Sequence, residues 1–301
     1  MTNSNLLIDG RVALGAFDFD GNILAPETTT YVIDRETGEE VGIPAHTLDQ
    51  SPELMQTKYR WKDDIIDSLI HFRDYHTDTK HLWPDQFKAD IEEALRSNAY
   101  APSLMKLKEV FLVPARLFAI ITARGHWPDN IARIMWIVNE QLLSAWEKEE
   151  QYKNILSLYQ SYTGKNENLT RDQALRFYFE EIVSYYPVSN PHIAKYLSLD
   201  ETLSSSEKKV KAMEHYTIDV QKRIITKLWL GVYPLAIGFS DDSVRNTLAM
   251  IEHYEQLRTN RAISDDTTVH IYFTGKQSEI QKLEKPWRSL EQSEDMIIVR
   301  I

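Results

Sequence analysis

Cysteine is absent from the 301 residues, which excludes disulfide bonds, thiolate zinc sites, iron–sulfur clusters and cysteine nucleophiles. No stretch of 18 consecutive apolar residues occurs, so the sequence predicts no membrane span. The first 15 residues lack a basic segment followed by a long apolar run, which argues against a signal peptide. Together these absences predict a cytoplasmic protein that has no membrane partner.

Acidic side chains outnumber basic ones, with 45 Asp and Glu residues against 34 Lys and Arg residues and a formal net charge of −11. This balance disfavours a broad nucleic-acid-binding surface, although it leaves room for a local basic groove. Apolar residues make up 43% of the chain and charged residues 26%, which is typical of globular proteins. The chain is long enough for one large domain or for a core domain that carries an insertion. None of these quantities determines the oligomeric state.

Short apolar segments alternate with longer helical patterns along the chain. Helical spacing begins after Pro128, and capping boxes at Thr170–Gln173 and Ser204–Glu207 open two more helices. The apolar segments are bounded by polar or turn residues, as strands buried on both faces of a parallel sheet are. These segments are Val12–Phe19, Leu117–Ile121, Leu235–Phe239 and Val269–Phe273, with Met296–Ile301 as a candidate final strand. The alternation predicts an α/β fold with a doubly wound, mostly parallel, Rossmann-like sheet.

Two stretches between the predicted strands are too long to be simple crossovers. Residues 29–109 begin with a hairpin, Thr29–Ile43, which turns at Glu36-Thr37-Gly38, and continue with helical patterns. We expect this stretch to form a flap hairpin and a helical cap over the ligand edge of the sheet. Residues 149–199 are helical and rich in Tyr and Phe, and are a candidate second cap element. The catalytic core is then expected in residues 1–28, 110–148 and 200–301.

The first predicted strand ends in an aspartate pair, in the segment Asp18-Phe19-Asp20-Gly21. Alternation along a strand places both carboxylates on the same side. The carboxyl ends of strands in doubly wound sheets face the crevice that binds ligands. Two neighbouring carboxylates repel each other, so such a pair commonly holds a cation, and oxygen ligands suit Mg²⁺. The alternative is a strand end whose polar residues simply enter a loop.

Three further segments carry polar residues at comparable places. Thr122 follows the second predicted strand, where a hydroxyl near backbone N–H groups either holds a phosphate oxygen or forms a turn. Asp241 and Asp242 follow the third strand, and helix capping explains one of these acids more naturally than both. Lys208 and Lys209 lie in the first turn of a predicted helix, where cations oppose the macrodipole, so they face either solvent or a local anion.

These four segments together resemble the motifs of the haloacid dehalogenase-like (HAD) hydrolase superfamily, and they occur in the family's order. The segment Asp18-Phe19-Asp20-Gly21-Asn22 is similar to the first motif, with Asn22 where threonine is commoner. Thr122 is similar to the second motif, Lys209 to the third, and Asp241-Asp242 to the acidic pair of the fourth. The resemblance covers the core but does not extend to the two long inserted stretches.

The resemblance implies a Mg²⁺-dependent phosphatase that hydrolyses phosphoric monoesters. Asp18 would form an aspartyl-phosphate, and Asp20 would protonate the leaving oxygen and later deprotonate a water. Thr122 and Lys209 would neutralise charge on the transferring phosphoryl group. Dehalogenases of the superfamily lack the second aspartate, so Asp20 favours phosphoryl transfer over dehalogenation.

The resemblance also implies which residues hold the metal and the substrate. Asp18, the backbone carbonyl of Asp20 and an acid from Asp241 or Asp242 would bind Mg²⁺, with Asn246 in support. Two choices stay open: which of the two acids binds directly, and which lysine of the helix belongs to the motif. Lys209 is preferred because it lies one helical turn before Met213, and the other candidates are Lys208 and Lys211. Substrate contacts are expected from Gly21, Asn22, Thr122, Ala123 and Arg124.

The expected substrate is a small phosphorylated metabolite, and the motifs leave its identity open. Arg124 and His126 either touch a second anionic group of the substrate or serve local structure. One alternative is a HAD-like phosphometabolite-binding or regulatory protein without catalysis, and another is a nucleic-acid end phosphatase. A third is a nucleotide-sugar glycosyltransferase that uses the first aspartate pair, but this leaves Thr122 and the Asp241-Asp242 pair without a role.

Overall fold

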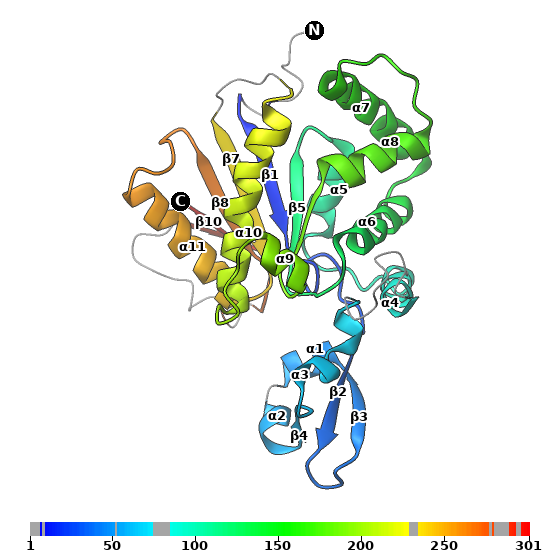
Figure 1. Ribbon diagram of the computed structural model, residues 1–301, viewed down its shortest axis with the longest axis vertical. Coiled ribbons are helices and arrows are strands. Elements are labelled where there is room, and N and C mark those ends of the chain that lie inside the picture. Colours follow the sequence, from blue (N-terminus) through cyan, green and yellow to red (C-terminus); the bar gives the residue numbers. More distant parts are fainter. Residues whose placement is uncertain are drawn as a thin grey trace.

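The computed structural model describes residues 7, 10–51, 53–74, 85–228, 234–276, 279, 289–292 and 296–301. Its main feature is a seven-stranded sheet in the order β6-β5-β1-β7-β8-β10-β9 (Figure 1). The first five strands in this order run parallel, and β10 and β9 pair antiparallel at one edge. The strands are β1 Val12–Phe17, β5 Leu117–Thr122, β6 Ser184–Pro187, β7 Leu235–Asp241, β8 Thr268–Phe273, β9 Ser289–Gln292 and β10 Ile297–Arg300. The predicted α/β class and mostly parallel sheet are confirmed.

The strands form where the sequence has its apolar runs, because the central strands are covered on both faces. Every residue of β5 is buried. Several strands differ from prediction: β1 ends at Phe17 rather than at Phe19, and β9 was not predicted. Strand β7 continues two residues beyond Phe239, since its last residues still pair with β8. Strand β6 was not predicted, because its four residues SYYP include a proline, which a strand tolerates at a sheet edge.

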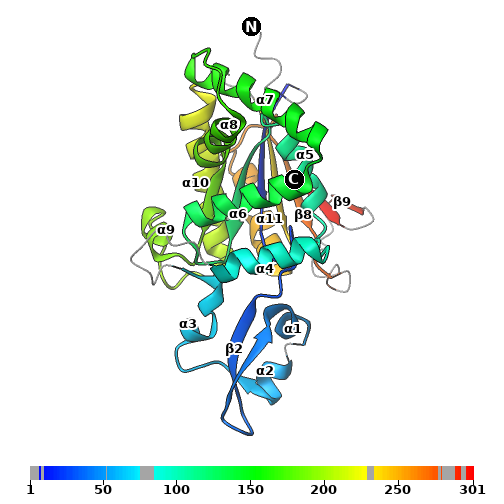
Figure 2. The ribbon, with the colours of Figure 1, turned by 90° about the vertical axis from the view of Figure 1, so that its right-hand side faces the viewer.

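Helices cover both faces of the sheet. On one face α10 (Ser205–Val220) packs beside α11 (Val244–Thr259), and α5 (Leu104–Leu112) lies on the opposite face (Figure 2). Helices α4 (Asp85–Arg96) and α6 (Pro128–Leu142) pack with each other on the side of α5. This arrangement is a doubly wound, Rossmann-like core, in which the chain builds outward from β1 through β5 to β6 on one side and then through β7 to β8 on the other side.

The stretch 149–199 belongs to the body of the protein. Helices α7 (Ala145–Thr163) and α8 (Arg171–Phe177) lie at the end of the sheet away from the carboxyl ends of its strands (Figure 1). Ile155, Leu158 and Phe179 join the main hydrophobic core, the last from the π-helix η3 (Tyr178–Ile182). The chain then forms β6 and the short α9 (Pro191–Tyr196). Several aromatic side chains of this stretch, among them Tyr178, Phe179 and Tyr186, therefore pack into the core, whereas Tyr196 is exposed.

The stretch after β1 forms a small subdomain beyond the carboxyl ends of the strands (Figure 1). Its sheet has the order β3-β2-β4, with β2 Thr29–Asp34, β3 Glu40–Pro44 and β4 Tyr59–Arg60. The predicted hairpin is β2 and β3, and the Asp34 carboxylate accepts hydrogen bonds from two backbone N–H groups of its turn. Short helices complete the unit: α1 Ala45–Gln50, α2 Glu53–Thr57, α3 Ile65–Ser68 and the 3₁₀ helix η2 Ile70–Phe72.

The subdomain has its own small core, made by Val32, Ile43, Leu48 and Tyr59. Helix α4 instead buries its apolar face in the main core through Phe87, Ile91 and Leu95. The inserted unit therefore ends before α4, earlier than the boundary predicted at residue 109, because an amphipathic helix looks the same in sequence whichever core it joins. Among the described residues, no helix has the length and apolar character needed to cross a membrane.

Candidate active site

The candidate site lies where β1 and β7 end side by side. The crossover after β1 leads to β5 on one side, whereas β7 pairs with β1 on the other side, which makes this pair the switch point of the sheet. Ligands of doubly wound sheets bind outside the carboxyl ends of the strands at this point. The Asp18 N–H donates a 2.9 Å hydrogen bond to the carbonyl of Ser240, so residues 18 and 241 are held next to each other.

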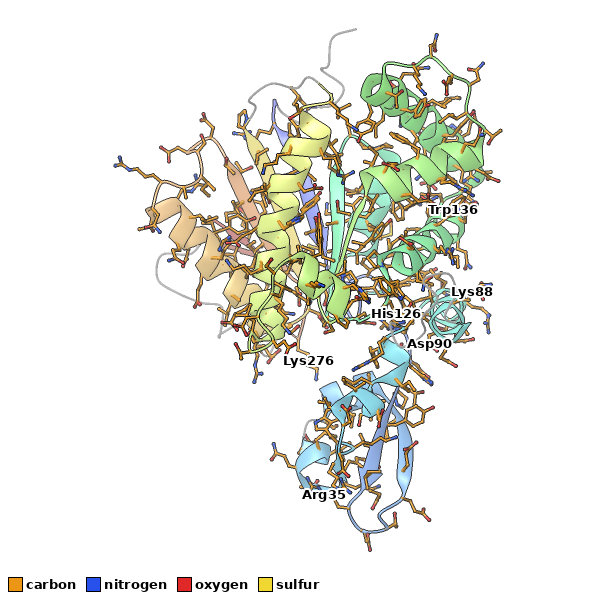
Figure 3. All side chains as sticks on the ribbon, in the orientation of Figure 1. Arg35, Lys88, Asp90, His126, Trp136 and Lys276 are labelled. Carbon is orange, nitrogen blue, oxygen red and sulfur yellow. The ribbon has the colours of Figure 1, made fainter. Side chains whose placement is uncertain are left out.

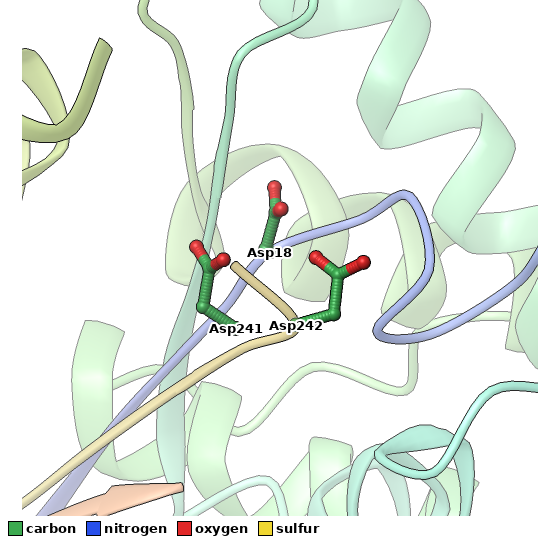
Figure 4. A group of neighbouring side chains, drawn as sticks. All are labelled: Asp18, Asp241 and Asp242. Carbon is green, nitrogen blue, oxygen red and sulfur yellow. The ribbon is translucent and has the colours of Figure 1, made fainter. Parts of the chain in front are cut away.

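Three carboxylates gather at this place (Figure 4). Asp18, Asp241 and Asp242 each offer an oxygen, and the three oxygens lie within 4.8 Å of one another. Asp18 and Asp241 are buried, and Asp242 is half-buried. The structure thus brings together the first and fourth predicted segments, which are more than 200 residues apart in sequence. The carboxylate of Asp20 is not part of the group.

A buried lysine lies between two of the carboxylates. Lys209 Nζ is 2.9 Å from Asp18 Oδ2 and 2.7 Å from Asp241 Oδ2, and its side chain is only 1% exposed. Of the three candidate lysines, Lys209 is the one on the buried face of α10, which it shares with Met213. Lys211 is exposed and Lys208 is half-buried. Although burial opposes the charged form, the carboxylates of Asp18 and Asp241 outweigh it and raise the pKa of Lys209.

The charges in this cluster do not balance, because three carboxylates face one ammonium group. Burial, opposed by Lys209 and reinforced by Asp241, raises the pKa of Asp18 to about 7. Burial, together with the charges of Asp18 and Asp241, raises the pKa of Asp242 to about 8. The site therefore favours either protons or an added cation at neutral pH.

The two adjacent acids have different surroundings. The Asp241 carboxylate accepts hydrogen bonds from Lys209 at 2.7 Å, from the Ser243 N–H at 2.8 Å and from Asn246 Nδ2, 3.0 Å from each oxygen. The supporting position expected for Asn246 is thus next to Asp241. No hydrogen bond joins the Asp242 carboxylate to another described residue, and Asp18 Oδ1 is buried without a partner. Asp241 therefore fixes Lys209, and Asp18 and Asp242 keep oxygens free for a cation.

Asn22 connects four segments of the chain below the site. Its Nδ2 group donates to the carbonyls of Asp18 and Ser240, at 3.0 and 3.1 Å. Its Oδ1 atom accepts three hydrogen bonds of 2.8 Å, from the hydroxyls of Ser103, Ser240 and Thr274. The side chain is fully buried, and its hydrogen bonds hold the ends of β1 and β7 together.

The other predicted contact residues lie around the turn that follows β5. Thr122 is buried, and its hydroxyl accepts a 3.3 Å hydrogen bond from the Arg124 N–H, while Ala123 is exposed. Arg124 is fully buried and directs its guanidinium at Asp20, with Nε–Oδ2 and Nη2–Oδ1 distances of 2.8 and 2.7 Å. The predicted acid/base thus has an arginine partner, and this arginine is not directed at open solvent.

Gly21 is placed against the carboxylate of Asp242. Its φ of +68° is in the left-handed region, and a Cβ atom there would lie 2.2 Å from Asp242 Oδ2. Only glycine combines this backbone conformation with this close approach. Gly21 thus shapes the space in which Asp242 lies.

Sequence reasoning missed three hydroxyl residues that hold Asn22. Thr274 directly follows β8, so the argument used for Thr122, a hydroxyl after an apolar strand, would have found it. Ser240 lies inside β7, and Ser103 comes from the N-cap of α5. Neither has a local signal, because each meets Asn22 only after the strands are assembled.

Comparisons with known protein families, with curated proteins and with solved structures give no match for this chain. What the protein does is therefore inferred from the side chains that meet at the switch point.

Proposed function

We propose that the protein is a Mg²⁺-dependent phosphatase that hydrolyses a phosphoric monoester through an aspartyl-phosphate on Asp18. One observation carries the proposal: buried Lys209 bridges Asp18 and Asp241 at the switch point of the sheet. Residues from the first, third and fourth motif-like segments thus meet at the place where such a fold binds ligands. The arrangement supports the resemblance to the HAD superfamily, which rested on sequence motifs alone.

The residues present fit a divalent cation. Three carboxylates against one ammonium leave an excess of negative charge. Burial raises the pKa values of Asp18 and Asp242, and the neighbouring carboxylates add to this increase. Among the residues that the structure describes, none donates a hydrogen bond to the buried Asp18 Oδ1 or to the Asp242 carboxylate. These are hard oxygen donors of the kind that Mg²⁺ prefers. When bound there, Mg²⁺ would neutralise the carboxylates and draw charge from the oxygens of the phosphoryl group.

Asp18 supplies the nucleophile in this proposal. A carboxylate oxygen of Asp18 forms a bond to phosphorus while the bond from phosphorus to the leaving oxygen breaks. The ammonium of Lys209 lies 2.9 Å from Asp18 and is held there by Asp241, so its charge is fixed before the substrate arrives. A preorganised charge of this kind stabilises the phosphoryl group as its negative charge shifts.

Asp20 acts as general acid and then as general base. It gives a proton to the leaving oxygen in the first step, and it takes one from the attacking water in the second. In that second step the water oxygen binds phosphorus, the bond to Asp18 breaks, and phosphate leaves. The side chain of Asp20 is 35% exposed, so it can reach both the leaving group and water.

The small subdomain is the proposed cap. It begins at Thr29, a short loop after Asp18 and Asp20, and it extends beyond the carboxyl ends of the parallel strands (Figure 2). The carboxylate cluster lies at the ends of two of these strands, β1 and β7. A unit in this position can cover the substrate and exclude water during transfer. It would select the leaving group, while the cluster provides the phosphoryl-transfer chemistry.

The test is phosphate release from p-nitrophenyl phosphate and from a panel of phosphorylated metabolites, with Mg²⁺ or with EDTA. Wild type, Asp18→Asn and the surface control Asp63→Asn are compared; the Asp63 side chain is fully exposed. We expect turnover that requires Mg²⁺, is lost in Asp18→Asn and persists in Asp63→Asn. Binding of phosphometabolites without turnover would instead favour a non-catalytic binding protein, and turnover that survives Asp18→Asn would refute the proposed nucleophile.

A further inference from the structure

Arg124 is among the largest fully buried side chains of the described residues, and its carboxylate partner is the proposed acid/base. The guanidinium makes a two-pronged contact with Asp20, and Nη2 also donates a 2.9 Å hydrogen bond to the Thr28 hydroxyl. A planar fork of this kind fixes both the position and the rotation of a carboxylate, which a single hydrogen bond does not.

Aromatic rings surround the same guanidinium. Its central carbon lies 4.3 Å from the ring centre of Phe87, 4.9 Å from that of Phe72 and 5.7 Å from that of Phe19. Cations over aromatic faces are stabilised by the ring quadrupole, more so when water is excluded. Because these rings leave the guanidinium little room, a shift in the position of the rings would also move the guanidinium.

Two of these partners belong to the two connections of the small subdomain. Thr28 immediately precedes β2, where the chain enters the subdomain, and Phe72 ends η2, the last described element of the subdomain. The Gly125 N–H donates a 2.8 Å hydrogen bond to the Phe72 carbonyl, directly beside Arg124. Figure 3 shows His126, two residues further on, at the junction between the sheet-bearing body and the subdomain.

Packing alone does not explain an arginine at this position. An apolar side chain of similar length would fill a space lined by three phenylalanine rings without burying a charge. The guanidinium donates hydrogen bonds to Asp20 and to Thr28, which lie on the two sides of the junction. These bonds explain why a charged side chain occupies this position.

We infer that Arg124 is a positioning residue that couples the orientation of the small subdomain to the orientation of Asp20. The inference rests on the proposed function, because Arg124 would act by positioning Asp20, the proposed acid/base. When the subdomain is seated, Thr28 and Phe72 hold the guanidinium, and the guanidinium holds Asp20 toward the leaving group. Proton transfer is then efficient only with the subdomain in place.

The kinetic test compares two leaving groups in Arg124→Met. A p-nitrophenolate leaves without help from an acid, whereas an alkoxide needs a proton, so the alkyl phosphate depends on Asp20. The measured quantity is kcat/KM, which includes the first phosphoryl transfer for both substrates. We expect kcat/KM to fall about 10- to 100-fold more for the best alkyl phosphate of the panel than for p-nitrophenyl phosphate.

The matched control is Arg171→Met. Arg171 on α8 also makes a two-pronged contact with a carboxylate, Glu140 on α6, but far from the junction. The Arg171→Met variant should change neither kcat/KM value by more than a small factor. If Arg124→Met folds poorly, Thr28→Val removes one hydrogen bond from the guanidinium at nearly constant shape and should change the ratio in the same direction. Equal losses for both substrates, or a gain for the alkyl phosphate, would overturn the positioning role.

The structural test measures the junction without relying on catalysis. Since the chain has no cysteine, spin labels can be attached at Glu36→Cys in the hairpin turn and Gln141→Cys on α6, both at exposed positions. Electron–electron resonance then gives the distance distribution between subdomain and body. We expect a narrow distribution in wild type and Arg171→Met, and a broader one in Arg124→Met.

The two tests separate the failure of this inference from that of the proposed function. A wild type that hydrolyses no phosphoester refutes the proposed function, while the distance distributions still report whether Arg124 seats the subdomain. A wild type that is active, together with a distribution that stays narrow in Arg124→Met, refutes the coupling and leaves the phosphatase proposal intact.

Discussion

Burial of the Asp18 carboxylate beside two other carboxylates leads to an unusual expectation for Asp18→Asn: this variant should be more stable than the wild type at pH 8 when no metal is present. Asp18 has a pKa of about 7 in the folded protein, against an ordinary value of 3.8. The folded state therefore holds this proton more tightly than the unfolded state does. The stabilising contribution is complete below about pH 4 and is lost as the pH rises through about 7.

The size of the effect follows from the shift. A difference of about three pKa units corresponds to about 4 kcal/mol lost from the free energy of unfolding when the pH rises from 4 to 8. Asparagine removes the titrating charge, but its buried Nδ2 group lacks an acceptor, which costs about 1–3 kcal/mol. The net gain at pH 8 is then about 1–3 kcal/mol, or a melting temperature about 2–8 °C higher.

Thermal unfolding in EDTA, followed by circular dichroism at pH 5 and pH 8, measures the gain. The difference between Asp18→Asn and wild type should be large at pH 8 and should shrink at pH 5, where Asp18 is mostly protonated. Asp63→Asn, on the surface, should show no such difference at either pH. Millimolar Mg²⁺ should raise the melting temperature of the wild type at pH 8 far more than that of Asp18→Asn, because ligand binding stabilises the folded state.

Two results would refute this reasoning. One is an Asp18→Asn variant that is destabilised equally at both pH values, which would mean that Lys209 already compensates the carboxylates. The other is a wild type whose stability does not respond to Mg²⁺ at pH 8, which would mean that the excess charge does not create a cation site.

Two more variants test the supports of the cluster. Asn22→Ala should lower the free energy of unfolding by about 3–5 kcal/mol in urea denaturation, because five buried hydrogen bonds lose a partner; a loss below about 1 kcal/mol would contradict this. Gly21→Ala should weaken Mg²⁺ binding about 10- to 100-fold in calorimetry, because the new Cβ atom displaces Asp242. Gly38→Ala is the matched control, since its φ is also positive and its Cβ would meet nothing within 4 Å, so it should bind Mg²⁺ as wild type does.

Much of the fold could be predicted because its signals are local. The strands of the parallel sheet are apolar runs, since both of their faces are covered. Lys209 could be preferred over Lys211 because helical spacing places it on the face of Met213, and this face is buried. The carboxylates could be located because residues that directly follow parallel strands meet at one edge of the sheet.

Features that depend on contacts between residues far apart in the sequence could not be predicted. The end of the inserted unit was placed too late because α4 is amphipathic whichever core it covers. Strand β6 was missed because its sequence is short and contains Pro187, which only an edge position tolerates. The hydrogen bonds of Asn22 could not be predicted either, because they include Ser240, 218 residues away, and no local pattern reveals this partner.

By itself, the sequence determined the α/β class, the apolar strands and the types of side chain at the strand ends, because these depend on residues within one or two turns of chain. Only the tertiary structure decided which carboxylate stays free and which is bonded to Lys209. It also decided that Arg124 holds Asp20, across a sequence separation of 104 residues. Partners so distant are fixed by the order of strands in the sheet, since that order sets which loops meet at its edge.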